Sequence, residues 1–237
     1  KMEKEEVFAI MGKYYGNAYY RCKDLTVDDA KFITAFLDKI NSLGYYFSNL
    51  HKLTEVCDLR FMEIIKDFYL QYQDSIGAGI KEQMLSGLNH REYKEIVPFL
   101  LEVYYPLDAE KEYLFKYRVS DIINIIRNKK YEKEYVEIIR DPNYKKYDGI
   151  YELLCNLKSE AALPRIIELV HLYPREFKFD FLQASWKYKK PELIKEYQAF
   201  LDDKDREIRT MAKRAIRKVE EAEQKRLGKE AAGKAEK

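Results

Sequence analysis

Apolar residues between Val119 and Val219 recur every 31 positions, and no other feature of the sequence constrains the fold as strongly. The recurrence produces six columns of mostly apolar residues, all in one register. They are Ile126, Leu157, Tyr188 and Val219; Ile123, Leu154, Ser185 and Ile216; Val119, Ile150, Phe181 and Ala212; Tyr135, Ile166 and Tyr197; Ile138, Leu169 and Phe200; and Ile139, Val170 and Leu201. Six columns in one register are not expected by chance, so the same structural unit is repeated along the chain.

The spacing of the columns within one unit predicts two helices. The first three columns lie at relative positions i, i+4 and i+7, and the other three at i, i+3 and i+4. Both spacings place side chains on one face of a helix. A unit is therefore a pair of short antiparallel helices, and a period of about 30 to 47 residues made of helix pairs is typical of an α-solenoid. We expect an all-α fold with about six such pairs.

The repeat continues upstream with a longer period. Shifting the frame by 38 residues instead of 31 aligns Val97 with Tyr135, and other apolar positions follow in the same way. The additional residues fit in 105–111, where Pro106 must end the preceding helix. We infer an insertion in the turn inside the third helix pair.

The domain prediction follows from the way repeats contact only their neighbours, which sets no upper limit on length. Residues 1–222 are expected to form a single solenoid. Its first part, 1–90, is expected to consist of degenerate capping pairs, and 91–222 of the clearer repeats. Residues 223–237 have almost no large apolar side chains, so we predict a charged, disordered tail there.

Three segments resemble short HEAT repeats of the lyase type. The sequence at 156–169, Asn-Leu-Lys-Ser-Glu-Ala-Ala-Leu-Pro-Arg-Ile-Ile-Glu-Leu, and the sequence at 187–194, Lys-Tyr-Lys-Lys-Pro-Glu-Leu-Ile, are similar to the turn between units and the first helix of that repeat. The sequence at 201–216 looks like its Asp turn and its Ala-containing second helix. The resemblance is good from Glu132 to Val219 and implies a HEAT-like superhelix. It says little about activity, because this architecture hosts many unrelated functions.

The balance of charge argues against a general nucleic-acid binder. The chain has 43 Lys and Arg residues and 41 Asp and Glu residues, which leaves a net charge of +2, and the two signs are interleaved.

No apolar run reaches the roughly 18 residues that a membrane-spanning helix needs, so no membrane association is expected. The 3 cysteines are far apart and lack a Cys-x-x-Cys spacing, which fits a reducing compartment. We expect a cytoplasmic protein.

Local motifs for catalysis or metal binding are missing from the sequence. The histidines, His51, His90 and His171, are isolated from one another, so we expect each to be a surface or packing residue. We expect the cysteines to be packing residues or incidental thiols. Carboxylate pairs begin at Asp28 and Asp202, where helices should start, so capping is their expected role. We predict no catalytic residue, no metal site and no cofactor, and favour a protein that is not an enzyme.

One row of residues on the second helices is predicted to face away from the core. It lies about 180° from the core columns on a helical wheel of roughly 100° per residue. Its members are Tyr117, Asp121 and Asn124; Asp148, Glu152 and Cys155; Phe179, Gln183 and Trp186; and Thr210, Arg214 and Arg217. The resemblance to HEAT repeats implies that second helices line a concave face. The alternative is that Phe179 or Trp186 turns into the core, as most large aromatic side chains do.

Tyrosine is unusually abundant, with 21 residues. Several tyrosines lie outside the core columns, including Tyr144, Tyr147 and Tyr151. For any single tyrosine, packing at the edge of a helix face is the expected role. A cluster of them also suits a recognition surface, because each offers apolar area and a hydroxyl group.

These observations predict a non-enzymatic scaffold or adaptor that binds another protein or a peptide along the concave face. The expected binding residues are Tyr117, Asp121, Asp148, Glu152, Phe179, Gln183, Trp186, Arg214 and Arg217. The aromatic residues would supply buried area, and the charged ones would set register and association rate. The alternative is a nucleic-acid-binding or DNA-repair glycosylase-type protein, as some HEAT-like solenoids are. The acidic members of the row and the small net charge disfavour nucleic acid.

Overall fold

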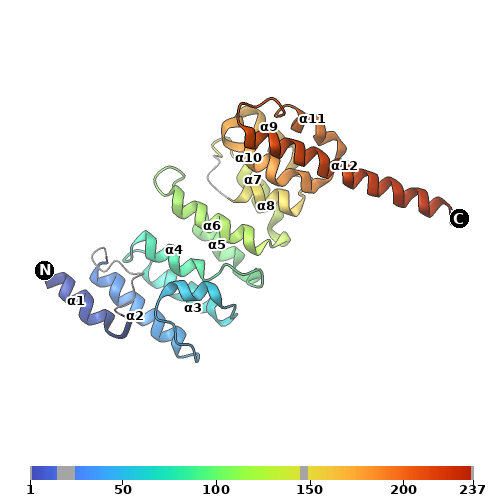
Figure 1. The fold of residues 1–237 in the computed structure, drawn as a ribbon. Helices are drawn as coiled ribbons and strands as arrows, with labels where there is room; N and C mark the ends of the chain where they lie inside the picture. Colours follow the sequence, from blue (N-terminus) through green and yellow to red (C-terminus); the bar gives the residue numbers. More distant parts are fainter. Residues whose placement is uncertain (1, 15–24, 145–148, 236–237) are drawn as a thin grey trace. The chain divides into compact units, whose positions relative to one another are not determined.

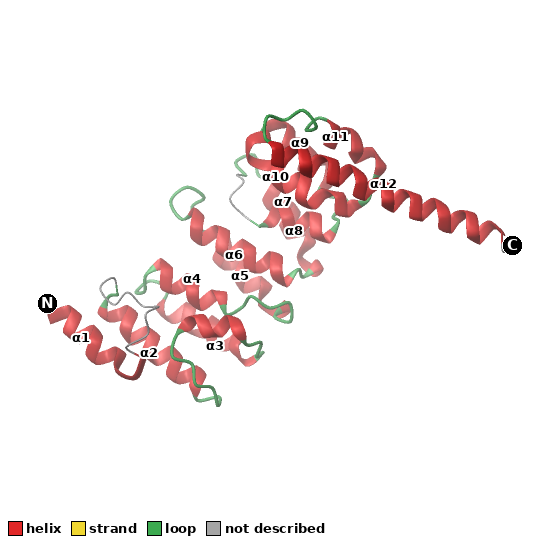
Figure 2. Ribbon diagram, viewed as in Figure 1, coloured by secondary structure: helices red, strands yellow, loops and turns green. Residues whose placement is uncertain are grey.

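The computed structural model describes residues 2–14, 25–144 and 149–235, and these residues form helices and loops without any strand (Figure 2). The α-helices are α1 (Met2–Met11), α2 (Val27–Asn41), α3 (Arg60–Tyr72), α4 (Ala78–Ser86), α5 (Val97–Tyr104), α6 (Tyr113–Ile126), α7 (Glu132–Arg140), α8 (Ile150–Leu157), α9 (Leu163–Leu172), α10 (Pro174–Ala184), α11 (Ile194–Gln198) and α12 (Arg206–Ala235). Short 3₁₀ helices are η1 (Gly12–Tyr14), η3 (Leu50–Glu55), η4 (Lys94–Ile96), η5 (Lys129–Tyr131), η6 (Ser185–Tyr188) and η7 (Pro191–Leu193). The all-α prediction is confirmed for the described residues.

The chain divides into two compact units (Figure 1). Unit 1 is Lys1–Ile126 and contains α1 to α6, and unit 2 is Arg127–Lys237 and contains α7 to α12. This division differs from the expectation of one uninterrupted repeat domain. The continuous superhelix therefore stays a prediction.

Within each unit the helices associate as consecutive pairs. In unit 1, α1 contacts α2, α3 contacts α4, and α5 contacts α6 (Figure 1). In unit 2, α7 contacts α8, α9 contacts α10, and α11 contacts α12. Second helices of successive pairs also touch, since α4 packs on α6, α8 on α10, and α10 on α12. The helix pair that the sequence period predicts is thus the building block of both units.

The core columns of the sequence are buried with few exceptions. Val119, Ile150, Phe181 and Ala212 form one column, and all four are 0% exposed. The exceptions are half-buried: Leu157 at the end of α8, Phe200 and Leu201 in the turn after α11, and Ile216 within α12. The remaining members lie in the core, so the six columns identify the packed faces of both helices in a pair.

The period is also visible in the backbone, at the residues that follow α6, α8 and η6, the 3₁₀ helix after α10. Arg127, Lys158 and Lys189 are spaced 31 residues apart, and all three adopt a left-handed conformation with φ of 52°, 56° and 56°. Lys158 ends α8, and its N–H group donates to the carbonyl of Cys155 at 3.1 Å. A left-handed residue is a common way to end a helix, but side chains other than glycine adopt it at a cost. The repeat therefore fixes where the chain turns as well as what it buries.

Local signals in the sequence also set the helix starts. Thr26 caps α2, because its hydroxyl group accepts from Asp29 N–H at 3.0 Å while the Asp29 carboxylate accepts from Thr26 N–H at 3.0 Å. This reciprocal pair is a capping box, so Asp29 has the capping role expected of its carboxylate pair. The connection from α5 to α6 contains 105–111, which is where the insertion was expected.

Two expectations need correction. Tyr144 and Tyr151 are 7% and 1% exposed, so they belong to the core, while Tyr147 lies outside the described residues. The Tyr151 hydroxyl group donates to the carbonyl of Ile166 at 3.1 Å, which allows it to be buried.

The tail is not irregular in its described part, because α12 continues to Ala235. Pairs such as Arg226 with Glu223, at 2.6 Å, support this extension on the helix surface.

Candidate functional site

The predicted binding residues are divided between the two units. Tyr117 and Asp121 lie on α6 in unit 1. Six others lie in unit 2: Glu152, Phe179, Gln183, Trp186, Arg214 and Arg217. Asp148 lies outside the described residues. Each unit is therefore considered with its own members of the row, and the shared binding surface stays a prediction.

The outward orientation is observed for most of the row. Phe179 and Tyr117 are 39% and 46% exposed. Gln183, Arg214 and Arg217 are exposed, and Asp121 and Glu152 are half-buried. Two further members of the row, Asn124 and Cys155, are buried at 5% and 0% exposure, which corrects the expectation for them. The cause at Cys155 is that α8 packs against α7, α10 and η6, so its buried face is wider than one helical stripe.

Trp186 lies between the two alternatives that the sequence left open. Its side chain is half-buried, and its indole N–H donates to the carbonyl of Gln183 at 2.8 Å. The Lys218 ammonium group lies 5.9 Å from the centre of the ring, which is a cation–π contact. Trp186 therefore covers the surface of unit 2 between η6 and α12.

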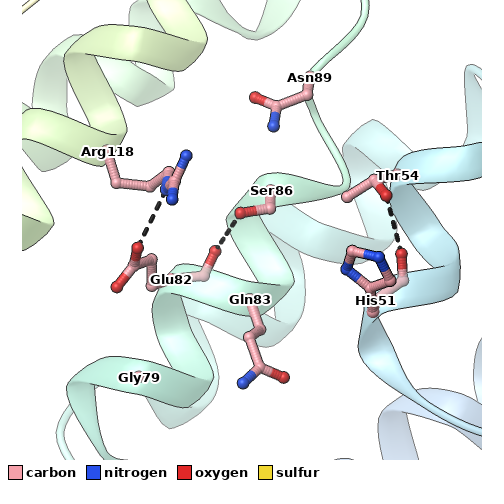
Figure 3. A pocket seen from close by; sticks show the side chains of 8 residues that line it. All are labelled: His51, Thr54, Gly79, Glu82, Gln83, Ser86, Asn89 and Arg118. Atoms are coloured by element: carbon pink, nitrogen blue, oxygen red, sulfur yellow. Dashed lines mark hydrogen bonds and ion pairs between the residues drawn. The ribbon is translucent and has the colours of Figure 1, made fainter. Parts of the chain in front are cut away.

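A polar pocket of about 520 Å³ lies within unit 1 (Figure 3). It is lined by His51 and Thr54 of η3, by Gly79, Glu82, Gln83 and Ser86 of α4, by Asn89 after α4, and by Arg118 of α6. The α4 residues occupy positions i, i+3, i+4 and i+7, which form one face of a helix. A second helix of unit 1 thus presents a polar stripe to the pocket.

Close approach of η3 to the end of α4 depends on Gly87. A Cβ atom at Gly87 would lie 2.9 Å from the Cβ of Leu53 and 3.2 Å from Cδ1 of Ile65. The start of α4 is held by Asp29, whose carboxylate accepts from Gly77 N–H at 2.9 Å. Both ends of α4 are therefore fixed against neighbouring elements, and its polar stripe is held in place.

The charged groups of the pocket pair with each other. Arg118 Nε lies 3.0 Å from Glu82 Oε1 (Figure 3). Arg118 Nη1 also lies 3.6 Å from Oδ2 of Asp121, which is outside the lining. These side chains are each about one third exposed, so the pairs contribute little to stability. Asp121 of the predicted row thus contacts a residue that lines the pocket.

Two carboxamide oxygens at the pocket are buried without a hydrogen-bond partner among the described residues. They are Oε1 of Gln83 and Oδ1 of Asn89. Buried polar atoms are paired in the great majority of cases, and an unpaired one costs about 1 to 3 kcal/mol. A water molecule or a ligand that donates hydrogen bonds would satisfy these two atoms. Sequence reasoning missed these residues because Gln and Asn carry no motif.

A cluster of metal-ligand types lies near the pocket, on the loops that follow η3 and α4. Ligand atoms of Cys57, His90 and Glu92 lie within 4.8 Å of one another, and the Cys57 thiol lies 3.7 Å from Glu92 Oε2. The Nε2 atom of His90 is buried and has no partner among the described residues. These residues were expected to be incidental because they are far apart in the sequence. The fold brings Cys57 close to His90 and Glu92.

The described cysteines are poor nucleophiles. Burial raises the pKa of the Cys155 thiol well above its ordinary value. Cys57 is exposed, and partial desolvation of its sulfur also raises the pKa of the thiol; the Tyr93 hydroxyl group opposes this shift and the Glu92 carboxylate reinforces it. Reactive cysteines need the opposite shift. Thiol-based catalysis therefore has no support at either residue.

Comparison of the chain with family models, with curated proteins and with solved structures found no match. The resemblance to HEAT repeats stays a prediction from the sequence. Among the described helices, none has both the length and the apolar character needed to cross a membrane. The function must therefore be argued from the site itself.

Proposed function

We propose that this chain is a HEAT-like α-solenoid that binds an extended segment of another protein, and that the polar pocket of unit 1 contacts the backbone of that segment. The observation that carries the proposal is the pair of buried, unpartnered oxygens on Gln83 and Asn89. Both atoms are acceptors, and a peptide backbone supplies an N–H donor at each residue other than proline. Pairing them with a bound segment would recover the cost of leaving them unsatisfied.

The shape of the pocket supports a chain-like ligand. Gly79 and Ser86 are seven positions apart on α4, which corresponds to a length of about 10 Å at 1.5 Å per residue. An extended chain covers this distance with about three residues. The pocket volume of about 520 Å³ suits such a short stretch and excludes a folded domain.

The charges of the pocket support a segment that is not acidic. Arg118 is the cation of the lining, and two carboxylates, those of Glu82 and Asp121, lie beside it. A phosphate or a carboxylate ligand would meet more negative than positive charge there. This balance favours a peptide backbone over nucleic acid, in keeping with the near-neutral chain.

The test uses peptides selected from a random display library on the whole chain, with affinity measured by fluorescence anisotropy. Gln83→Met removes the buried acceptor with little change in volume. We expect it to maintain or raise the melting temperature while weakening peptide binding by about fivefold to a hundredfold, the equivalent of 1 to 3 kcal/mol. Gln71→Met, at an exposed position of α3, is the matched control and should change neither quantity.

A third variant separates the pocket from the predicted surface of unit 2. Trp186→Ala should leave binding unchanged if the segment lies in the pocket. If Gln83→Met has no effect while Trp186→Ala weakens binding by roughly 2 kcal/mol or more, the binding surface is that of unit 2 and the pocket assignment is wrong. Failure to select any peptide from the library would contradict the proposed function itself.

A further inference from the structure

We propose that Cys57, His90 and Glu92 form a binding site for a divalent cation of the zinc class. The three residues come from two loops, one after η3 and one after α4. Their ligand atoms, one sulfur, one ring nitrogen and one carboxylate oxygen, lie within 4.8 Å of one another. This inference is independent of the proposed function, because none of the three residues lines the pocket.

The one distance known within the cluster fits a tetrahedral ion. Zinc binds sulfur at about 2.3 Å and carboxylate oxygen at about 2.1 Å, which places two such atoms about 3.6 Å apart in tetrahedral geometry. The observed separation of Cys57 Sγ and Glu92 Oε2 is 3.7 Å. The thiol donates to the carboxylate at this distance, and a cation would replace that proton.

The buried nitrogen of His90 is the second observation that points to a ligand. Nε2 of this ring is shielded from solvent and has no partner among the described residues. The ring packs edge-on against Tyr93, with centroids 5.6 Å apart and an interplanar angle of 79°. An imidazole that is held in one orientation with an unsatisfied nitrogen is suited to bind a metal ion.

The two loops are held together without the three ligands. The buried hydroxyl group of Tyr93 donates to the carbonyl of Asp58 at 3.1 Å and accepts from Asp58 N–H at 2.8 Å. The Asp58 carboxylate in turn pairs with Arg60 and accepts from the Tyr45 hydroxyl group at 2.8 Å. Cys57 and His90 are thus brought together by neighbouring residues, so little ordering would be needed when an ion binds.

The donor set determines the class of ion. Thiolate and imidazole favour zinc and similar transition metals, whereas magnesium and calcium require oxygen ligands. Three protein ligands leave the fourth tetrahedral position for water or for a group from outside. The exposure of Cys57 and Glu92 makes that position accessible.

The test uses Co²⁺ as the spectroscopic probe, with the full chain free of any affinity tag. We expect one Co²⁺ per chain, with a thiolate-to-cobalt charge-transfer band and the strong visible bands of tetrahedral cobalt. The charge-transfer band should disappear in Cys57→Ser and persist in Cys22→Ser and Cys155→Ala, which remove the other two thiols. Zn²⁺ should displace Co²⁺ and raise the melting temperature of the parent protein.

Two further variants test the other ligands. Glu92→Gln, at an exposed position, should reduce Co²⁺ affinity by more than about a hundredfold, because losing a residue that only supports a ligand already costs 10- to 100-fold. His90→Gln should do the same, with circular dichroism as the check that it folds. A parent chain without the charge-transfer band in excess Co²⁺, or a band that persists in Cys57→Ser, would refute the site. Gln83→Met should leave Co²⁺ binding unchanged, which keeps this test separate from that of the pocket.

Discussion

Replacing Lys158 by glycine should stabilise unit 2. Lys158 has a φ of 56°, and the left-handed conformation costs a residue with a Cβ atom about 1 to 2 kcal/mol. Glycine removes that strain. It also gives the unfolded chain more conformational freedom, which lowers the free energy of unfolding by about 0.4 to 1 kcal/mol. The Lys158 side chain is exposed, so little packing is lost. The net expectation is a stabilisation of about 1 kcal/mol.

The matched control is the same substitution in a helix interior. Lys213 is exposed and lies within α12, where glycine costs about 1 kcal/mol. The two variants should therefore change the free energy of unfolding in opposite directions from the parent, and they should differ from each other by about 2 kcal/mol. Urea unfolding followed by circular dichroism measures both, with equal slopes as the condition for comparison. Equal destabilisation by Lys158→Gly and Lys213→Gly would refute the reasoning from backbone conformation.

Two further predictions concern the core. Leu154→Ala should lower the free energy of unfolding by about 2 to 5 kcal/mol, because Leu154 is 0% exposed and belongs to a column shared by successive pairs. A loss below about 1 kcal/mol in urea, or one no larger than that of the exposed Leu227→Ala, would contradict this role. In alkaline solution, burial raises the pKa of Tyr69 to about 12, so its neutral form stabilises the fold below pH 10 and this contribution is lost as the pH rises toward 12. Buried Tyr69 should form tyrosinate only together with loss of helical circular dichroism, and complete tyrosinate absorbance in a folded chain would contradict this.

The helix pairs and their turns were predictable from sequence because each depends on local and periodic information. A column such as Val119, Ile150, Phe181 and Ala212 repeats the same burial, and hydrophobic periodicity records burial directly. The cap at Thr26 and the insertion before α6 were predictable for a similar reason, since proline and capping residues act on their immediate neighbours.

The site was not predictable because it depends on contacts between distant segments. The pocket needs η3, α4 and α6 together, and its informative atoms belong to Gln83 and Asn89, whose types are common on any surface. Cys57 and His90 meet because Gly87 allows η3 to approach α4, a contact that no periodic pattern encodes. The helical wheel predicted that Cys155 lies outside the core, because a wheel assumes one buried face for each helix. α8 has several neighbours, so more than one of its faces is buried.

The recurring left-handed residues have a consequence for the modular character of unit 2. Lys158 and Lys189 leave their helices with the same φ of 56°, so residues 159–189 begin and end at equivalent backbone junctions. The helices on either side already touch in the same order, α8 with α10 and α10 with α12. A second copy of this segment, inserted after Lys189, would enter and leave through turns that the chain already makes. Unit 2 is thus a natural starting point for building longer versions of this protein, in which the number of helix pairs is chosen by the designer.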